Sequence, residues 1–339
     1  NIILATSLNL TTGFLGQIAI GHAGFMSIGA YTAALFVKYI ESTGVVLLAN
    51  GDPTPQGQLF FLISLVLGGL LAAVFGLLVG IPALRLKGDY LAIITLGFGM
   101  IIVNIINNLP FCGQDGLSLG SASASLYKNG LGFGTKAKVT FLWVAILVAI
   151  VCMTQMFLFI RSKYGRAIRA IRDNEIAASA SGINVNYYKV LTFTISAFFA
   201  GITGALYACC NGALTTTSFA FTNGSILNSV FIVVMVVVGG MGSLTGSVIA
   251  AVVMFLLNYT IKNGAWVAAL PAIVQNVFAY PMLVYSIALI IVILFRPKGI
   301  MGSREFALCD IPRWPARIRA HFADAGAARA AKKEVSYHG

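Results

Sequence analysis

The sequence predicts an all-α polytopic membrane protein, and its composition carries that prediction. Of the 339 residues, 58% are hydrophobic and only 9% are charged, and the mean hydropathy is +0.90. A soluble domain carries roughly 25% charged residues, so this chain has too few polar side chains to cover a water-soluble globule. Residues 1–37 and 190–261 contain no Asp, Glu, Lys or Arg. This composition excludes an ordinary soluble enzyme, a disordered chain and a disulfide-rich secreted scaffold.

About nine membrane-spanning helices are expected, because a helix needs about 20 apolar residues to cross a bilayer. The expected spans are 1–16, 22–40, 59–82, 89–108, 139–160, 190–210, 225–239, 242–261 and 280–296. A Gly-rich turn between the first two spans predicts a broken helix there, and the stretches near 1–24 and 212–239 also fit re-entrant segments. The prediction allows one more helix upstream of residue 1.

Positive charge gathers in three places and sets the expected orientation. The formal net charge is +12, and most basic residues lie at Arg85 and Lys87, in the segment 161–189, or from Arg296 onward. Lys and Arg are biased toward the cytoplasmic side of a membrane. Counting the expected spans places all three groups on that one side. No basic stripe is interleaved with aromatic residues, so no nucleic-acid partner is expected.

The domain organisation follows from this map. Residues 1–296 are expected to form one transmembrane domain, with an outer loop at 109–138 and a cytoplasmic loop at 161–189. Residues 297–339 are expected to form a basic cytoplasmic tail. The five cysteines include no Cys-x-x-Cys pair, so neither a zinc site nor a disulfide framework is expected.

The cytoplasmic segment 161–189 has the sharpest pattern in the chain. Arg166, Arg169 and Arg172 recur every third residue and therefore share one helix face. Three isoleucines are expected to form an apolar strip, and three alanines are small enough to let a partner approach closely: Ile168, Ile171, Ile176, Ala177, Ala178 and Ala180. Gly182 is expected to end this helix in a left-handed conformation, with a second short helix starting near Asn184. Docking on another protein and a plain solvated loop both fit the pattern.

The motif in this segment resembles that of a known family. Glu175-x-Ala177-Ala178-x-x-x-Gly182 resembles the EAA coupling segment of ATP-binding-cassette (ABC) importers, and the whole chain resembles the LivM type of permease subunits of branched-chain amino acid importers. Further stretches carry this resemblance in order, namely 7–10, 16–25, 29–33, 88–98, 165–184, 239–244 and 295–302.

The resemblance implies a multi-pass permease of the bacterial inner membrane that is not itself an enzyme. It implies as partners ABC ATPase subunits, a second permease subunit and an extracytoplasmic substrate-binding protein, with branched-chain amino acids as cargo. The expected ATPase contact comprises Arg166, Arg169, Glu175, Ala177, Ala178 and Gly182.

No cofactor is expected on this chain, because ATP is used by the partner subunits. Gly240-Met241-Gly242 lacks the lysine of a phosphate-binding loop and lies between apolar helices. We interpret it as a tight helix break.

Polar residues within the spans are candidates for the translocation pathway, since a polar group inside a bilayer needs a partner or a water-filled cavity. The candidates are Asn9, Gln17, His22, Thr95 and Asn228. Structural roles compete with this one: His22 bonded to backbone in a broken helix, Thr95 bonded to its own helix, and Asn228 as a helix cap.

Two alternative functions remain at this stage. The same architecture could import urea, short amides or a simple sugar. A secondary carrier or channel that acts alone is the other alternative, although the scarcity of carboxylates within the spans argues against ion coupling.

Overall fold

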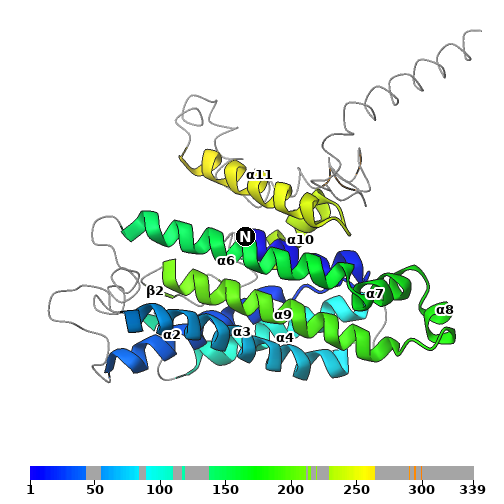
Figure 1. Ribbon diagram of the computed structural model, residues 1–339, viewed down its shortest axis with the longest axis horizontal. Helices are drawn as coiled ribbons and strands as arrows, with labels where there is room; N and C mark the ends of the chain where they lie inside the picture. The colour runs from blue at the N-terminus through cyan, green and yellow to red at the C-terminus, as the bar shows by residue number, and fades with distance from the viewer. Residues whose placement is uncertain are drawn as a thin grey trace, which may run out of the picture. The chain divides into compact units, whose positions relative to one another are not determined.

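The structure, a computed structural model, is nearly all helical (Figure 1). It describes residues 1–42, 55–83, 89–109, 117–118, 137–210, 213–214, 219, 229–263, 290, 294 and 299. Every described residue belongs to the compact unit Asn1–Ser303. The predicted tail 297–339 lies outside the described residues except for Gly299, and so do Arg85, Lys87 and most of the predicted outer loop.

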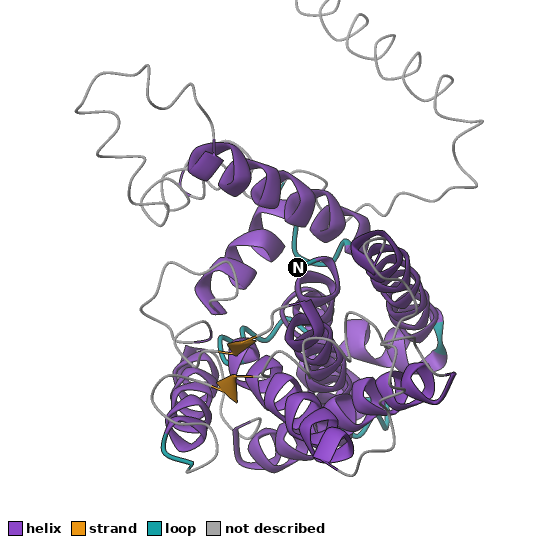
Figure 2. Ribbon diagram, turned by 90° about the vertical axis from the view of Figure 1, so that its left-hand side faces the viewer, coloured by secondary structure: helices purple, strands orange, loops and turns teal. Residues whose placement is uncertain are grey.

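The helices follow the chain with few interruptions. They are α1 (Ile2–Asn9), the π-helical turn η1 (Leu10–Phe14), α2 (His22–Ser42), α3 (Pro55–Ala83), α4 (Asp89–Asn107), α6 (Ala137–Arg161), α7 (Lys163–Asp173), α8 (Glu175–Ala180), α9 (Val185–Cys210), α10 (Ser229–Gly239) and α11 (Leu244–Asn263). Two short strands that the sequence analysis did not predict, β1 (Leu117–Ser118) and β2 (Ala213–Leu214), pair antiparallel (Figure 2).

Four of these helices are long and apolar enough to cross a membrane: His22–Ile40, Phe60–Ala83, Trp143–Arg161 and Val185–Ala208. Four shorter apolar helices are Ile2–Phe14, Tyr90–Ile106, Ser229–Gly239 and Leu244–Thr260. Each of the first eight predicted spans therefore coincides with an apolar helix. The ninth, 280–296, lies outside the described residues apart from Ile290 and Leu294, so the count of nine stays a prediction.

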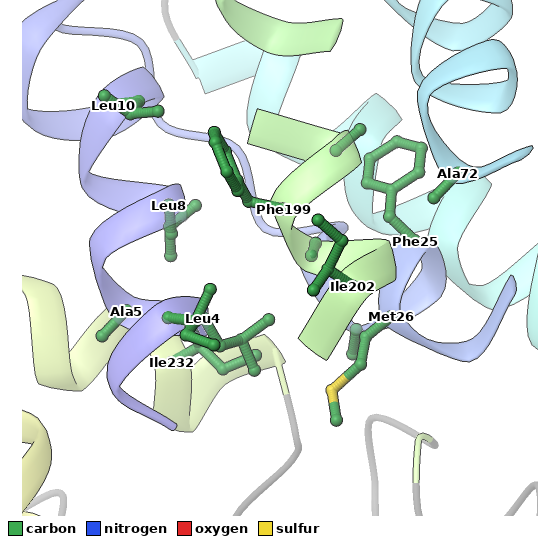
Figure 3. Packing of buried hydrophobic residues seen from close by; sticks show 14 of the residues in the cluster. Leu4, Ala5, Leu8, Leu10, Phe25, Met26, Ala72, Phe199, Ile202 and Ile232 are labelled. Atoms are coloured by element: carbon green, nitrogen blue, oxygen red, sulfur yellow. The ribbon is translucent and has the colours of Figure 1, made fainter. Parts of the chain in front are cut away.

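The core forms where α9 packs against α2 and α3, with α1 and α10 beside them. Figure 3 shows Phe199 and Ile202 of α9 among buried side chains from the neighbouring helices. A glycine permits the closest approach: a Cβ on Gly204 would lie 1.9 Å from the carbonyl oxygen of Met26 on α2. Small residues at such crossings let helix backbones touch inside a membrane.

The segment 161–189, which the sequence predicts to be cytoplasmic, differs from its predicted form. It contains two short helices, α7 and α8, where the sequence suggested one, and α9 begins at Val185 as a long spanning helix. The break occurs at Asn174, whose backbone is extended and whose Oδ1 accepts hydrogen bonds from the backbone N–H groups of Ile176 and Ala177, both at 3.0 Å. Asn is a favoured helix N-cap, so this side chain starts a new helix.

Gly182 adopts the predicted left-handed conformation, with φ +82°. It ends α8, and not the arginine-bearing helix α7. The N–H of Ile183 donates to the carbonyl of Ala178 (3.1 Å) and that of Gly182 to Ser179 (3.0 Å), which closes the carboxyl end of the helix. Figure 1 shows α7 and α8 at one end of the spanning helices and β2 at the other end.

Candidate functional site

Helix α7 buries one face and exposes its arginines. The hydroxyl of Ser162 caps its amino end by accepting from the N–H of Tyr164 at 3.2 Å. Ile168 and Ile171 are buried in the core, as the predicted apolar strip requires. Arg166, Arg169 and Arg172 are exposed. Helix α7 is therefore an amphipathic helix that lies against the rest of the chain along its isoleucines.

The predicted apolar strip is wrong for Ile176, which is exposed. The prediction that Ala178 is open to a partner is also wrong, because Ala178 is buried. Ile176 is 83% exposed, whereas Ala178 is 4% exposed and belongs to the hydrophobic core. The reason is the break at Asn174, because the helical register of α7 does not continue into α8. The side chain of Ala178 therefore does not lie on the exposed face that the Glu-x-Ala-Ala pattern suggests, while Ala177 does.

Glu175 is held by an ion pair inside the chain. Its Oε1 accepts from the Nζ of Lys189 at 2.9 Å, and the side chains are 43% and 4% exposed, respectively. Lys189 lies on α9, so this pair fastens α8 to the first turns of a spanning helix. The pattern of Glu175 alone gave no sign of this partner, since the two residues are separated by the Gly182 turn.

Arg169 also has a contact within the chain. Its Nη2 donates to the carbonyl of Ile160 at 3.3 Å and its Nε donates to the carbonyl of Gly165 at 3.4 Å. A cation at the carboxyl end of a helix satisfies its last carbonyls and suits its dipole. Arg169 thus joins α6 to α7 through contacts within the chain.

Asn9 connects α1 to the turn between α10 and α11. Its Nδ2 donates to the Ser243 carbonyl and to the Ser247 hydroxyl, both at 2.8 Å, and its Oδ1 accepts from the N–H of Gly242 at 3.0 Å. The turn has Gly240 at φ +110° and Gly242 at φ +95°, which confirms the predicted tight helix break. All polar atoms of the Asn9 side chain are therefore used inside the protein.

His22 is buried at the start of α2, with 1% of its surface exposed. Its Nε2 lies 3.2 Å from the Ser7 hydroxyl and 3.1 Å from the Ser196 hydroxyl. Both hydroxyls donate elsewhere, Ser7 to the carbonyl of Leu4 and Ser196 to the carbonyl of Ser7. The network therefore assigns the proton to Nε2. His22 is bonded to hydroxyls of α1 and α9, and not to backbone as one interpretation of the sequence held.

The other ring nitrogen of His22 is an unpaired acceptor. Its Nδ1 is buried and has no hydrogen-bond partner among the residues that the structure describes. The Oε1 of the half-buried Gln17 is likewise buried and has no hydrogen-bond partner among the described residues. Buried polar atoms in proteins are normally satisfied, so both atoms mark places where a water or a polar ligand gains a hydrogen bond.

Thr95 joins α4 to the irregular segment that precedes α2. Its hydroxyl donates to the carbonyl of Ala92 at 3.0 Å, which confirms the predicted bond to its own helix. The same hydroxyl accepts from the N–H of Ile20 at 3.1 Å. Asn228 lies outside the described residues. Its neighbour Ser229 begins α10 and accepts from the N–H of Ala23 at 3.1 Å.

A small cavity lies beside the amino end of α2, between α4 and α10. Its walls include Gly24, Gly99, Met100, Phe219 and Ser229. His22, Thr95 and Ser229, whose interactions are described above, lie on the three helices around it, α2, α4 and α10. Among the residues that the structure describes, no group of three His, Cys, Asp or Glu side chains is placed to hold a metal ion.

Comparison with known proteins identifies the family. Residues 1–294 match the family described as the branched-chain amino acid transport system / permease component. The chain belongs to this family. It is therefore a multi-pass membrane permease component of the branched-chain amino acid type, as the motifs predicted. No solved structure matches the chain significantly.

Individual relatives agree with this assignment. The high-affinity branched-chain amino acid transport system permease protein LivM of Escherichia coli is 32% identical over 88% of this chain and 67% of its own length. The corresponding protein BraD of Pseudomonas aeruginosa is 28% identical over 89% of this chain and 92% of its own. The fructose import permease protein FrcC of Rhizobium meliloti is more distant, at 24% identity over 69% of this chain and 71% of its own.

Proposed function

We propose that this permease is the transmembrane subunit of an ABC importer in a bacterial inner membrane, where it forms the pathway for branched-chain amino acids. It hydrolyses no ATP itself. Separate ATPase subunits drive it, a second permease subunit completes the pore, and an extracytoplasmic binding protein delivers the substrate. Family membership supports this assignment, and so does the similarity to LivM and BraD.

The observation that carries the ATPase contact is the form of α8. It is a short helix with an 83% exposed isoleucine, Ile176, beside the exposed Ala177. The Asn174 cap, the Glu175–Lys189 pair and the Gly182 turn fix it at both ends. An exposed, rigid apolar side chain with small neighbours suits insertion into a pocket on a partner.

The arginines of α7 supply the polar part of the same contact. Arg166 and Arg169 are exposed, and basic side chains beside an apolar centre match the polar rim of a typical interface. Because Lys and Arg are biased toward the cytoplasm, α7, α8 and the basic tail face the ATPase side. In this assignment Ala178 acts through packing, and Glu175 and Gly182 act by holding α8 in place.

The pathway is proposed to pass the amino end of α2. His22, Gln17 and Thr95 surround this region, and a small cavity lies beside it. Interrupted helices offer backbone N–H and carbonyl groups to a zwitterion without buried charges. Asn9 bonds the turn at Gly242 and is assigned to the fold, while Asn228 stays a predicted pathway residue.

Co-purification with transport assays tests the proposal. The double variant Gly182→Trp/Glu175→Lys is expected to reach the membrane, to lose at least 90% of the co-purified ATPase and to lose ATP-driven leucine uptake. Leu78→Trp is the control, because Leu78 is 59% exposed on the apolar face of α3 and a tryptophan is tolerated there. Unchanged uptake in the double variant would refute the proposed contact.

The choice of cargo is tested separately, since a fructose permease is among the relatives. Proteoliposomes with the complete transporter are expected to take up leucine, isoleucine or valine, and an excess of fructose or urea should not compete. Uptake of leucine by this chain in the absence of any ATPase would instead support a secondary carrier.

A further inference from the structure

Arg172, in the last turn of α7, touches two left-handed glycines from separate parts of the chain. A Cβ built on Gly16 (φ +76°) would lie 3.1 Å from the Cγ of Arg172. A Cβ built on Gly242 (φ +95°) would lie 2.7 Å from its Nη1 and 3.7 Å from its Cζ. The stem of Arg172 therefore packs on Gly16, and its guanidinium group packs on Gly242.

The two glycines belong to one connected unit, which we call the paired elbows. The first elbow comprises η1 and residues 15–21, and the second is the turn 240–243 between α10 and α11. Asn9 ties them together through the N–H of Gly242 at 3.0 Å. The backbones also touch, because a Cβ on Gly13 would lie only 2.3 Å from the nitrogen of Gly242.

The first elbow leads directly to the region proposed for the pathway. It passes from Gly16 to Ile20, whose N–H donates to Thr95 of α4, and then to His22 at the start of α2. Displacing Gly16 therefore pulls on the segment that positions the amino end of α2. The π-helical turn η1 is the kind of helix irregularity that is frequent at functional sites.

The three arginines of α7 are not equivalent in this respect. Arg169 bonds the carbonyls of Ile160 and Gly165, which lie at the junction of α6 and α7. Arg166 lies about 1.7 helical turns before Arg172 and its side chain is exposed. Arg172 is thus the arginine of α7 whose described contacts reach the breaks between spanning helices.

We propose that Arg172 is a positioning residue that transmits the displacement of α7 to the paired elbows and so couples ATP hydrolysis to opening of the pathway. This inference rests on the proposed function, because it requires an ATPase that moves α7 and α8. If α7 and α8 slide relative to the paired elbows, the contact of the Arg172 guanidinium group with Gly242 and that of its stem with Gly16 change together.

The test separates transport from ATP hydrolysis in the reconstituted complex of permeases, ATPase and binding protein. Arg172→Ala is expected to leave ATP hydrolysis within twofold of the wild type, with leucine uptake per ATP at least tenfold lower. Arg172→Lys, which keeps an unbranched stem and a cation, is expected to restore at least half of the coupling. Arg161→Ala is the matched control, because Arg161 is exposed at the end of α6 and packs on Phe157. It should change neither quantity more than twofold.

If Arg172→Ala does not assemble, Arg172→Met takes its place, since it keeps a stem over Gly16 and removes the guanidinium group from Gly242. Uptake per ATP equal to that of Arg161→Ala in the assembled variant would overturn the inference and leave the proposed function intact. A wild-type chain that binds no ATPase and shows no ATP-driven uptake would overturn both. A purely structural role would lower the amount of complex without changing uptake per ATP.

Discussion

Two left-handed glycine turns of this permease make an instructive pair. Gly242 lies between α10 and α11, and a Cβ there would meet the guanidinium group of Arg172 at 2.7 Å. Gly182 lies between α8 and α9, and a Cβ there would meet no atom of the described residues within 4 Å. Both residues have a positive φ, +95° and +82°, so the backbone requirement is the same and only the surroundings differ.

The turn at Gly242 is held by packing within the chain, whereas the turn at Gly182 is exposed in the described part of the structure. Around Gly242, the amide of Asn9 and the backbone of Gly13 hold the turn in place. Around Gly182, the described residues provide a cap, an ion pair and an exposed Ile176, and none of them covers the glycine. A side chain added to the backbones packed at the first turn should therefore affect folding, and a change to the exposed side chains near the second should affect partners.

Gly13→Val should have the largest effect on folding. Its Cβ would lie 1.7 Å from the Oδ1 of Asn9 and 2.3 Å from the nitrogen of Gly242. Overpacking of this kind costs about 3 kcal/mol, measurable as the free energy of unfolding in mixed detergent micelles. Gly97→Val is the matched control, because a Cβ on Gly97 of α4 would have no neighbour within 4 Å in the part of the chain that the structure describes. Equal losses in the two variants would contradict the proposed tightness of the elbows.

Asn9→Ala should have the next largest effect. It removes three hydrogen bonds and leaves the N–H of Gly242 and the hydroxyl of Ser247 without this partner. Leaving a buried polar group unsatisfied costs about 2 kcal/mol, to be read from the same unfolding experiment. Asn108→Ala is the control, since Asn108 is exposed just after α4 and its side chain donates to the carbonyl of Asn104. A surface change of this kind alters stability by less than about 0.5 kcal/mol. A loss no larger than that of the control would remove Asn9 from the elbow network.

Glu175→Ala should cost about 1–2 kcal/mol, because it leaves the buried Lys189 without its hydrogen-bonded carboxylate. A double-mutant cycle measures this contribution. Adding Lys189→Met to Glu175→Ala is expected to recover most of the loss, since no unpaired charge then remains in the interior. If the losses of Glu175→Ala and of Lys189→Met alone simply add in the double variant, the two side chains do not interact as described.

Ile176→Ser should have the smallest effect on folding, below about 0.5 kcal/mol, because Ile176 is 83% exposed. Its effect should instead appear in binding, as an affinity for the ATPase subunit that is about tenfold lower. Ser179→Ala on the same short helix is the control and should leave both quantities unchanged. A stability loss comparable to that of Asn9→Ala would erase the contrast between the two turns.

Most of the fold could be predicted because hydropathy and charge act over whole helices. The uncharged stretches locate eight apolar helices to within a few residues, and Gly240-Met241-Gly242 marks the turn between two of them. The pairing of β1 with β2 was not predictable, since each strand has two residues and no period. The break at Asn174 was missed because an Asn within an arginine-rich helical pattern resembles any polar position until its capping hydrogen bonds are seen.

The candidate site was predictable in its members but not in its connections. Glu175 was predicted as an ATPase contact, and Asn9 and Thr95 as polar residues of the pathway. Their partners Lys189, Ser243 and Ile20 lie 14, 234 and 75 positions away, respectively. Such distances in sequence carry no local pattern. Ser7 and Ser196, which bond His22, were missed for the same reason. Serine in an apolar helix is the only signal that could have found them, and it is a weak one.

The ion pair between α8 and α9 has one further consequence. An isolated helix of six residues is not stable in water, because nucleation costs more than so few hydrogen bonds return. Here the Lys189 side chain and the Asn174 cap hold α8 in shape before any partner arrives. Association with the proposed ATPase subunit then requires little additional ordering of the permease, so part of the binding free energy is determined by contacts within the permease itself.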